Sequence, residues 1–283
     1  YYSGRHSTHP SYQASSYKWF LSDYNENVYK NSIQPYSCAY LHNYPEKNPE
    51  PLKDPVYSEI VNESPVYFKD DQAKLEEFIR KHVGYGNGSD ILYEIESGNI
   101  KPGKKLIDHV TGLFKGNMEF HLLEEQKVAY ETAIDIALNA TGKTVYIIRG
   151  GPGTGKSVIA INLMADLLLA GYNAHYATGS KAFTETLRRI IGNRGSVQFK
   201  YFNSYMGADP DAVDVLICDE AHRIRETSRD RFTPKAKRTD TPQLQELIDV
   251  SRISVFFIDQ DQVVRPAEIG SVKHIKEYAA KND

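Results

Sequence analysis

Residues 145–157 read VYIIRGGPGTGKS, an apolar run that opens into glycines and ends on lysine and serine. The run Thr144–Ile148 is rich in β-branched and aromatic residues, as is typical of a buried strand. Val158–Leu169 has the pattern of a helix, and Gly171 is a stop signal after it. A strand, a G-x-x-x-x-G-K-S loop and a helix in this order predict a phosphate-binding loop in an α/β domain.

The chemistry of such a loop follows from its residue types. Glycines let backbone N–H groups turn inward around phosphates, and the start of the helix adds positive potential. We expect Lys156 to reach the β- and γ-phosphates of ATP and the Ser157 hydroxyl to ligate Mg²⁺. The alternative is a glycine-rich turn without a ligand. The predicted nucleotide-binding residues of the loop are Gly151, Pro152, Gly153, Thr154, Gly155, Lys156 and Ser157.

A second acidic site is predicted at the end of another apolar strand. Val213–Glu220 reads VDVLICDE and is followed by alanine and histidine. We expect Asp219 to hold Mg²⁺, directly or through water. Glu220 would orient and deprotonate the attacking water, because phosphoryl transfer depends mainly on positioning and charge stabilisation. An acidic pair at a strand end also serves as a helix N-cap, so the preceding phosphate loop is what favours the catalytic interpretation.

The D-E-A-H sequence after a phosphate loop resembles motif II of the helicase superfamilies, and further stretches resemble motifs of superfamily 1. Gln126, in the helical stretch Phe120–Tyr130, lies where those helicases use a glutamine to bind the adenine edge. Thr178 ends the strand within Asn173–Gly179 and resembles motif Ia, whose strand end faces the nucleic-acid backbone. The ordinary alternatives are a solvated helix glutamine and a plain βα unit.

Ser254–Gln262, SVFFIDQDQ, resembles motif III, in which polar groups at a strand end sense the γ-phosphate. The resemblance implies that Asp259 contacts the nucleotide and that Gln262 takes part in catalysis. Ile258 stands where a glycine often precedes this aspartate. Arg265 is a further expected γ-phosphate contact, although its spacing from the glutamine does not match the pattern well.

Four segments together resemble a narrower family, the Schlafen group 3-like helicase domains of bacterial and archaeal proteins: IRGGPGTGKSVIAINL, LICDEAHRIRE, RFTPKAKR and FFIDQDQVVRPAEIG. The resemblance covers roughly residues 115–283. It implies a P-loop NTPase with a RecA-like parallel sheet flanked by helices, the first RecA-like domain of a superfamily 1 DNA/RNA helicase. Motifs IV to VI of that family lie in a second RecA-like domain. The chain stops at Asp283, so we expect that domain and its arginine finger to be missing and ATP hydrolysis by this chain to be weak.

A change in composition predicts a smaller N-terminal α/β domain at residues 1–114 and the RecA-like domain at residues 115–283. Of the 20 tyrosines, 13 lie in the first hundred residues, and the proline-rich segment 45–55 predicts an extended connector. After about residue 115, apolar runs of strand length alternate with helical patterns.

The first residues of the chain contain a second resemblance. Gln13 and Tyr17 give Q-x-x-x-Y on a predicted amphipathic helix within His9–Leu21, which is similar to a late helix of PD-(D/E)XK nucleases of the RecB type. Pro35–Tyr44 would then be a following strand. The metal-binding aspartate and E-x-K tripeptide of that fold precede the Q-x-x-x-Y, and neither precedes it here. We therefore expect any nuclease chemistry to lie outside this chain; the alternative is an ordinary surface helix.

Charge and cysteine usage limit the remaining options. Net charge is −3, so nucleic-acid contacts must come from local basic groups. The segment 223–238 has seven basic and two acidic residues, which suits either a phosphate backbone or a solvated insertion. Cys38 and Cys218 lack metal-ligand spacing and suit a reducing compartment, so we expect a cytoplasmic protein. No apolar run approaches the ~18 residues of a membrane span, and we expect no membrane partner.

The leading functional hypothesis is an ATPase motor domain that acts on single-stranded DNA or RNA. The alternative is an AAA+-like switch or assembly ATPase without strand translocation, which the motif III resemblance disfavours. A GTPase is disfavoured because the sequence has no N-K-x-D guanine signature. A kinase fits the loop, but the D-E-A-H sequence indicates water as the acceptor. The sequence leaves open DNA versus RNA and the oligomeric state.

Overall fold

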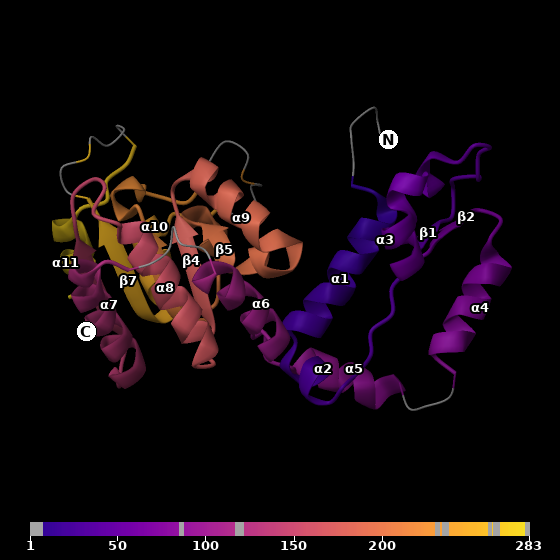
Figure 1. Ribbon diagram of the computed structural model, residues 1–283, viewed down its shortest axis with the longest axis horizontal. Coiled ribbons are helices and arrows are strands. Elements are labelled where there is room, and N and C mark those ends of the chain that lie inside the picture. Colours follow the sequence, from indigo (N-terminus) through magenta and orange to yellow (C-terminus); the bar gives the residue numbers. More distant parts are fainter. Residues whose placement is uncertain are drawn as a thin grey trace. The chain divides into compact units, whose positions relative to one another are not determined.

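The computed structural model describes residues 8–84, 88–116, 122–229, 233, 238–259, 262 and 267–280. The chain forms two compact units, Tyr1–Gly103 and Lys104–Asp283 (Figure 1). This division falls before the boundary predicted between residues 114 and 115. The reason is helix α6, Lys104–Lys115, which packs on helices α8 and α9 of the second unit.

A sheet of five parallel strands forms the centre of the second unit. The strands are β3 (Thr144–Arg149), β4 (Ala174–Thr178), β5 (Phe199–Tyr201), β6 (Val213–Asp219) and β7 (Ser251–Ile258). Their order in the sheet is β3-β7-β6-β4-β5, and every neighbouring pair is parallel. Parallel strands require helical crossovers that cover both faces of the sheet, so central strands are apolar along their whole length. Strands β6 and β7 are buried at all positions but one each.

Helices cover both faces of this sheet (Figure 1). They are α6, α7 (Glu124–Asn139), α8 (Lys156–Leu169), α9 (Lys181–Gly195), α10 (Gln243–Asp249) and α11 (Val272–Ala279). Side chains alternate along β6: Leu216 and Cys218 belong to the buried cluster that includes Leu247 of α10 and Ile275 of α11. Helix α8 contacts β4, β6 and β7 on the other face, and α6 and α7 pack against it. The predicted parallel α/β class is therefore confirmed.

The strand order brings three chain segments together at one edge of the sheet. Strand β7 lies between β3 and β6, with registers Arg149↔Ile258 and Cys218↔Phe256. Because the strands are parallel, their carboxyl ends meet at the same edge, which is where open α/β sheets bind ligands. The glycine-rich loop follows β3, Asp219 ends β6, and Asp259 follows β7.

The first unit is smaller and mostly helical. Its helices are α1 (Pro10–Tyr24), α2 (Glu26–Lys30), η1 (Pro51–Lys53), η2 (Pro55–Tyr57), α3 (Ser58–Glu63), α4 (Gln72–His82) and α5 (Gly88–Ser97). Strand β1 (Ala39–Leu41) pairs in parallel with β2 (Val66–Phe68). The unit therefore has an α/β composition, and β1 lies inside the stretch predicted to form a strand.

Helix α1 exists where the sequence predicts one, but it is not the amphipathic helix that we expected. Its buried residues are Ser11, Ser15, Asp23 and Tyr24, so the buried face is largely polar. The Gln13 Nε2 donates to the Tyr17 hydroxyl over 3.4 Å on the exposed side. The likeness of this pair to a nuclease helix stays a prediction.

Two further properties of the described part of the chain bear on function. Among the residues with a described structure, no helix has both the length and the apolar character needed to cross a bilayer. The same residues contain no group of three or more His, Cys, Asp or Glu side chains that could hold a metal ion.

We expect acid to destabilise the second unit through His175 on β4. Its Nδ1 lies 3.2 Å from the Tyr205 hydroxyl, and burial, together with the Lys200 ammonium, lowers its pKa from 6.5 to about 3. As the pH falls, the unfolded chain is protonated at His175 near pH 6.5, whereas the folded chain stays neutral there until about pH 3. The free energy of unfolding therefore decreases as the pH falls below about 6.5. At about pH 5 the loss should be about 2 kcal/mol of unfolding free energy.

Urea unfolding of the chain at about pH 7.5 and about pH 5 measures this loss. The variant His175→Gln should have a flatter pH dependence than the wild type by about 2 kcal/mol. His109→Gln is the matched control, because His109 lies exposed on α6 of the same unit. An unchanged pH dependence in His175→Gln would contradict the assignment.

Candidate nucleotide site

The loop between β3 and α8 has a backbone that only glycine adopts easily at two positions. Gly153 and Gly155 have φ values of 73° and 79°, in the left-handed region. A Cβ atom at Gly155 would also lie 2.1 Å from the Gln126 Nε2. The Gly150 N–H donates to the Ile258 carbonyl over 3.2 Å, which joins the start of the loop to the end of β7. Residues 152–154 are exposed, so the loop is open to a ligand.

Gln126, predicted from the superfamily 1 resemblance, lies directly against this loop. Its Nε2 donates to the Thr154 carbonyl over 3.1 Å, and its Oε1 accepts from the Leu123 N–H over 2.9 Å. The side chain is therefore oriented by both of its polar atoms. Helix α7 thus contributes a polar group to the edge of the glycine-rich loop, and the contact of Gln126 with adenine stays a prediction.

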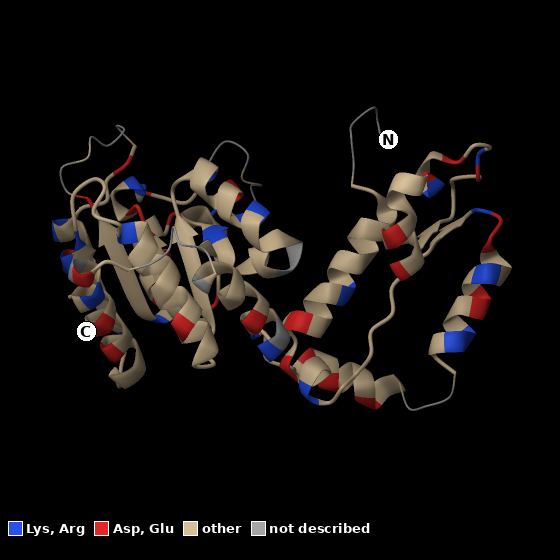
Figure 2. Ribbon diagram, viewed as in Figure 1, with Lys and Arg blue, Asp and Glu red and all other residues tan. Residues whose placement is uncertain are grey.

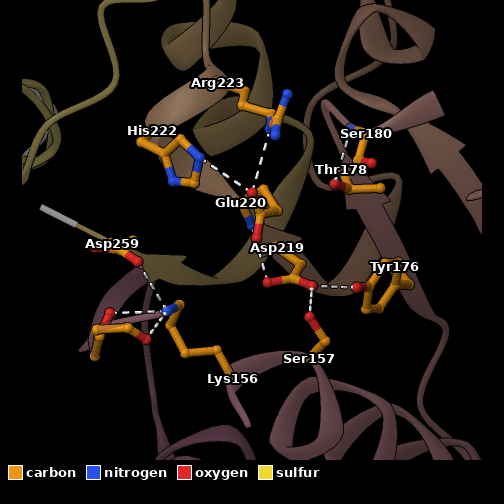
Figure 3. A network of polar contacts seen from close by, with 12 residues as sticks. Lys156, Ser157, Tyr176, Thr178, Ser180, Asp219, Glu220, His222, Arg223 and Asp259 are labelled. Atoms are coloured by element: carbon orange, nitrogen blue, oxygen red, sulfur yellow. Dashed lines mark hydrogen bonds and ion pairs between the residues drawn. The ribbon is translucent and has the colours of Figure 1, made fainter. Parts of the chain in front are cut away.

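Lys156, the first residue of α8, is turned back onto the loop. Its Nζ donates to the carbonyls of Gly150 and Gly151, at 2.8 and 2.7 Å, and lies 3.5 Å from the Asp259 Oδ2 (Figure 3). Both charged side chains are nearly buried, with 9% and 2% of their surface exposed. The two carbonyls accept hydrogen bonds from the ammonium, and the Asp259 carboxylate forms an ion pair with it. The structure therefore places Asp259 beside Lys156, while its contact with the nucleotide, which the motif III resemblance implies, stays a prediction.

Asp219 is the centre of a buried hydrogen-bond network at the end of β6 (Figure 3). Its Oδ2 accepts from the Ser157 hydroxyl over 2.5 Å and from the Tyr176 hydroxyl, and its Oδ1 accepts from the Glu220 N–H over 2.9 Å. Burial raises the pKa of this carboxyl, while the two hydroxyl donors oppose the shift. The network fixes the orientation of the carboxylate relative to the start of α8.

Ser157 and Asp219 fit a magnesium ion. Mg²⁺ takes oxygen ligands and is usually bound by one or two carboxylates together with substrate phosphates. The structure brings a hydroxyl and a carboxylate together beside a phosphate-type loop, and a cation would relieve the cost of keeping this buried carboxyl ionised. The described residues offer no larger ligand cluster, which agrees with a metal that depends on the nucleotide for its other ligands.

Glu220 follows immediately and has an unusual backbone. Its φ of 56° is left-handed, which is rare for a residue other than glycine and is common at functional sites. Its Oε2 lies 3.1 Å from the His222 Nε2 and accepts from the Arg223 Nε over 3.2 Å. These two contacts, the histidine first, lower the pKa of the Glu220 carboxyl. Glu220 is therefore a carboxylate at neutral pH, as a proton acceptor must be.

The remaining predicted residues are less directly connected to the site. Thr178 is fully buried at the end of β4, and its hydroxyl accepts from the Ser180 N–H over 3.1 Å. Its contact with nucleic acid stays a prediction. Gln262 is exposed in the segment after β7. Arg265 lies outside the described residues.

Sequence reasoning missed two members of the site, Tyr176 and His222. Both are buried and contact the acidic pair. A buried tyrosine hydroxyl usually has a hydrogen-bond partner, so the apolar context of Tyr176 was a usable signal. The identity of its partner depends on the β4–β6 register, in which Tyr176 pairs with Ile217 two positions before the aspartate.

Figure 2 shows Lys and Arg interspersed with Asp and Glu along the ribbon of each unit. This agrees with the net charge of −3. A polyanion would therefore have to be bound by local groups rather than by a general positive field.

The fold and the arrangement of the site define a P-loop NTPase domain of the RecA-like type. Residues 143–283 match the family model described as Schlafen group 3, DNA/RNA helicase domain, and this part of the chain belongs to that family. The predicted family is thereby confirmed. Membership in a helicase-domain family supports the assignment of these residues to a nucleotide-dependent motor domain.

No curated protein matches the chain. Among solved structures, the chain is similar to one titled as the crystal structure of a DNA replication initiation factor, with a TM-score of 0.31 and 17% sequence identity. The match covers 57% of this chain and 46% of that one, so the chain spans less than half of the solved protein.

Proposed function

We propose that the second unit is the ATP-binding and ATP-hydrolysing domain of a superfamily 1 type DNA/RNA helicase or translocase. One observation carries the proposal: Ser157 and Asp219 share a 2.5 Å hydrogen bond beside Glu220 at the end of the glycine-rich loop. This places two candidate metal ligands and a candidate general base within one network. Family membership of residues 143–283 supports the nucleic-acid side of the proposal.

The residues of the loop would bind the triphosphate. Its N–H groups and the start of α8 would face the phosphates, and Lys156 would exchange its carbonyl contacts for phosphate oxygens. Ser157 and Asp219 would hold Mg²⁺, which supplies charge neutralisation at the phosphate oxygens. Gln126 would bind the adenine edge from α7. Exchange of the Lys156 contacts would also change the surroundings of Asp259, which gives that residue a means to sense the γ-phosphate.

Glu220 would carry the chemical step. It would orient a water molecule for attack on the γ-phosphorus and accept one of its protons, while the bond to the bridging oxygen breaks and ADP leaves. The carboxyl is ionised at neutral pH, while its contacts with His222 and Arg223 lower its pKa and so weaken it as a base. Gln262 and Arg265, in the segment after β7, are proposed as further γ-phosphate contacts.

The proposed partners are single-stranded DNA or RNA and a second RecA-like domain that closes on the nucleotide. The exposure of residues 152–154 supports a nucleotide that is covered from outside this unit. A switch or assembly ATPase is the alternative function. It would bind ATP in the same loop without responding to nucleic acid.

Binding of a labelled ATP analogue in the presence of Mg²⁺ tests the nucleotide site. Lys156→Ala should weaken binding about 10- to 150-fold, because a hydrogen bond to a charged group contributes about 1.5–3 kcal/mol. Lys273→Ala is the matched control, since Lys273 lies exposed on α11 and pairs with Glu277. Equal affinity of the wild type and Lys156→Ala for the ATP analogue would contradict the assignment of Lys156 to the nucleotide site.

Turnover of ATP by the full protein, with and without single-stranded oligonucleotides, tests the motor function. We expect stimulation that falls steeply as salt is raised, because the contacts are to phosphates. ATP turnover that no DNA or RNA strand changes would favour the switch ATPase instead.

A further inference from the structure

A cleft of about 290 Å³ opens at the carboxyl ends of β4 and β5, beside the nucleotide site. Its lining includes the cationic side chains of Lys181, Arg223 and Arg225 and one carboxylate, Glu268. Asn203 and Tyr201 add polar and aromatic surface, so the cleft is polar and carries an excess of positive charge. Such a lining suits an anion, and a phosphodiester is the anion that the proposed function offers.

Arg223 belongs to both the cleft and the nucleotide site. Its Nε donates to the Glu220 Oε2 over 3.2 Å, while its side chain also lines the cleft. Figure 3 shows the rest of the guanidinium extending away from Glu220. A guanidinium has four N–H groups beyond its Nε, in a fork that matches phosphate oxygens. The side chain is 31% exposed, so an incoming ligand can reach it.

The backbone that carries Arg223 is held from two sides. A Cβ atom at Gly179 would lie 2.6 Å from the Arg223 Cβ, and one at Gly270 would lie 1.9 Å from the Ala221 carbonyl oxygen. The turn η6, Ala221–Arg223, therefore packs against two glycine backbones without room for added atoms. A response to a ligand in the cleft must come from the end of the Arg223 side chain rather than from movement of the turn.

We propose that this cleft binds a phosphate of the nucleic-acid backbone and that Arg223 couples this binding to Glu220. Without nucleic acid, Arg223 and His222 both contact the Oε2 of Glu220, so neither lone pair of that oxygen is left for a water molecule. A bound phosphate draws the guanidinium into the cleft and leaves one lone pair of Oε2 for the water, because a bidentate guanidinium–phosphate pair replaces a single hydrogen bond. Arg223 is thus a positioning residue that acts through Glu220. The inference rests on the proposed function.

Of the described cationic side chains near Glu220, only Arg223 both contacts the carboxylate and lines the cleft. His222 is buried, lies 3.1 Å from the same Glu220 oxygen and does not line the cleft. The glutamate therefore stays oriented when Arg223 leaves. Arg225 lines the same cleft but contacts Gln243 through its backbone N–H, over 2.8 Å, and its position is separate from the acidic pair. It can contribute to phosphate binding without affecting the base.

Steady-state kinetics of three variants in the full protein test the coupling: Arg223→Gln, Arg223→Lys and, as the matched control, Arg225→Gln. The quantities are kcat without and with a saturating single-stranded oligonucleotide, the oligonucleotide concentration for half-stimulation, and affinity for a labelled ATP analogue. Arg223→Gln should raise the unstimulated kcat toward the stimulated wild-type value, so that the stimulation ratio approaches unity. Arg225→Gln should raise only the half-stimulation concentration. Arg223→Lys should recover part of the stimulation, because it keeps a cationic donor.

Other outcomes overturn the coupling. If Arg223→Gln keeps the wild-type ratio and only needs more oligonucleotide, Arg223 is a phosphate contact without influence on Glu220. If both rates fall together at unchanged nucleotide affinity, Glu220 needs Arg223 in its active state. If neither quantity changes, the cleft is not the binding site. A wild-type protein that hydrolyses no ATP, or that no strand stimulates, defeats the proposed function itself and the inference with it.

Discussion

Replacing Glu220 with glutamine should leave ATP binding intact and lower turnover ~10²–10⁴-fold, the contribution typical of a general base. Glutamine keeps the shape of the side chain, and its amide oxygen can still accept from the Arg223 Nε. It cannot accept a proton from water at neutral pH. The measurement is kcat for ATP, with the affinity for a labelled analogue as the test of an intact site.

Glu277→Gln is the control for this substitution, because Glu277 lies on α11 and forms an ion pair only with Lys273 among the pairs described. It should have wild-type turnover. If Glu220→Gln also turns over at the wild-type rate, some other group activates the water.

A larger effect is expected from a second RecA-like domain. Hydrolysis at this site should be slow until an arginine from such a domain reaches the γ-phosphate, and an arginine finger contributes ~10³–10⁵-fold in other nucleotide hydrolases. The reason lies in the transition state, whose charge on the equatorial oxygens needs a cation beyond Lys156 and the metal. The exposed residues 152–154 leave that side of the loop accessible.

The experiment compares turnover of this chain with turnover of a polypeptide that also contains the second domain. Addition of the domain should raise kcat by at least ~10³-fold, and replacement of its γ-phosphate arginine by alanine should remove most of that gain. A chain that already hydrolyses ATP at the rate of the longer polypeptide would show that the site is complete without an added arginine.

The positions of Lys156, Ser157 and Asp219 could be predicted because topology alone brings them together. A strand–loop–helix unit in a parallel sheet places its loop at the carboxyl edge, and any strand of the same sheet that ends in an acidic residue points to that edge. Asp259 follows β7, so the same rule places it at that edge, whereas its ion pair with Lys156 is known only from the structure. These contacts depend on strand direction, which the sequence predicts as parallel, and on the strand order β3-β7-β6-β4-β5, which only the structure shows.

Other features depend on information that the local sequence lacks. The contact of Arg223 with Glu220 could not be seen in a run of basic residues, because it requires the left-handed backbone at Glu220 and the tight turn after it. Tyr176 required the register of β4 against β6. The unit boundary moved to Gly103 because α6 is assigned by its packing on α8, whereas composition changes only after this helix.

The hydrogen bond from Gln126 to the Thr154 carbonyl has a consequence for nucleotide selection. If adenine binds the Gln126 amide, the hydrogen bond between this amide and the Thr154 carbonyl is lost, and the glycine-rich loop is less restrained when the phosphates bind. Base recognition and phosphate capture then draw on the same donor and are not independent events. A triphosphate with a different base would leave the Gln126 amide hydrogen-bonded to the Thr154 carbonyl, so the glycine-rich loop would stay more rigid. Discrimination between bases would then appear in the mobility of residues 152–154 as well as in the affinity for the nucleotide.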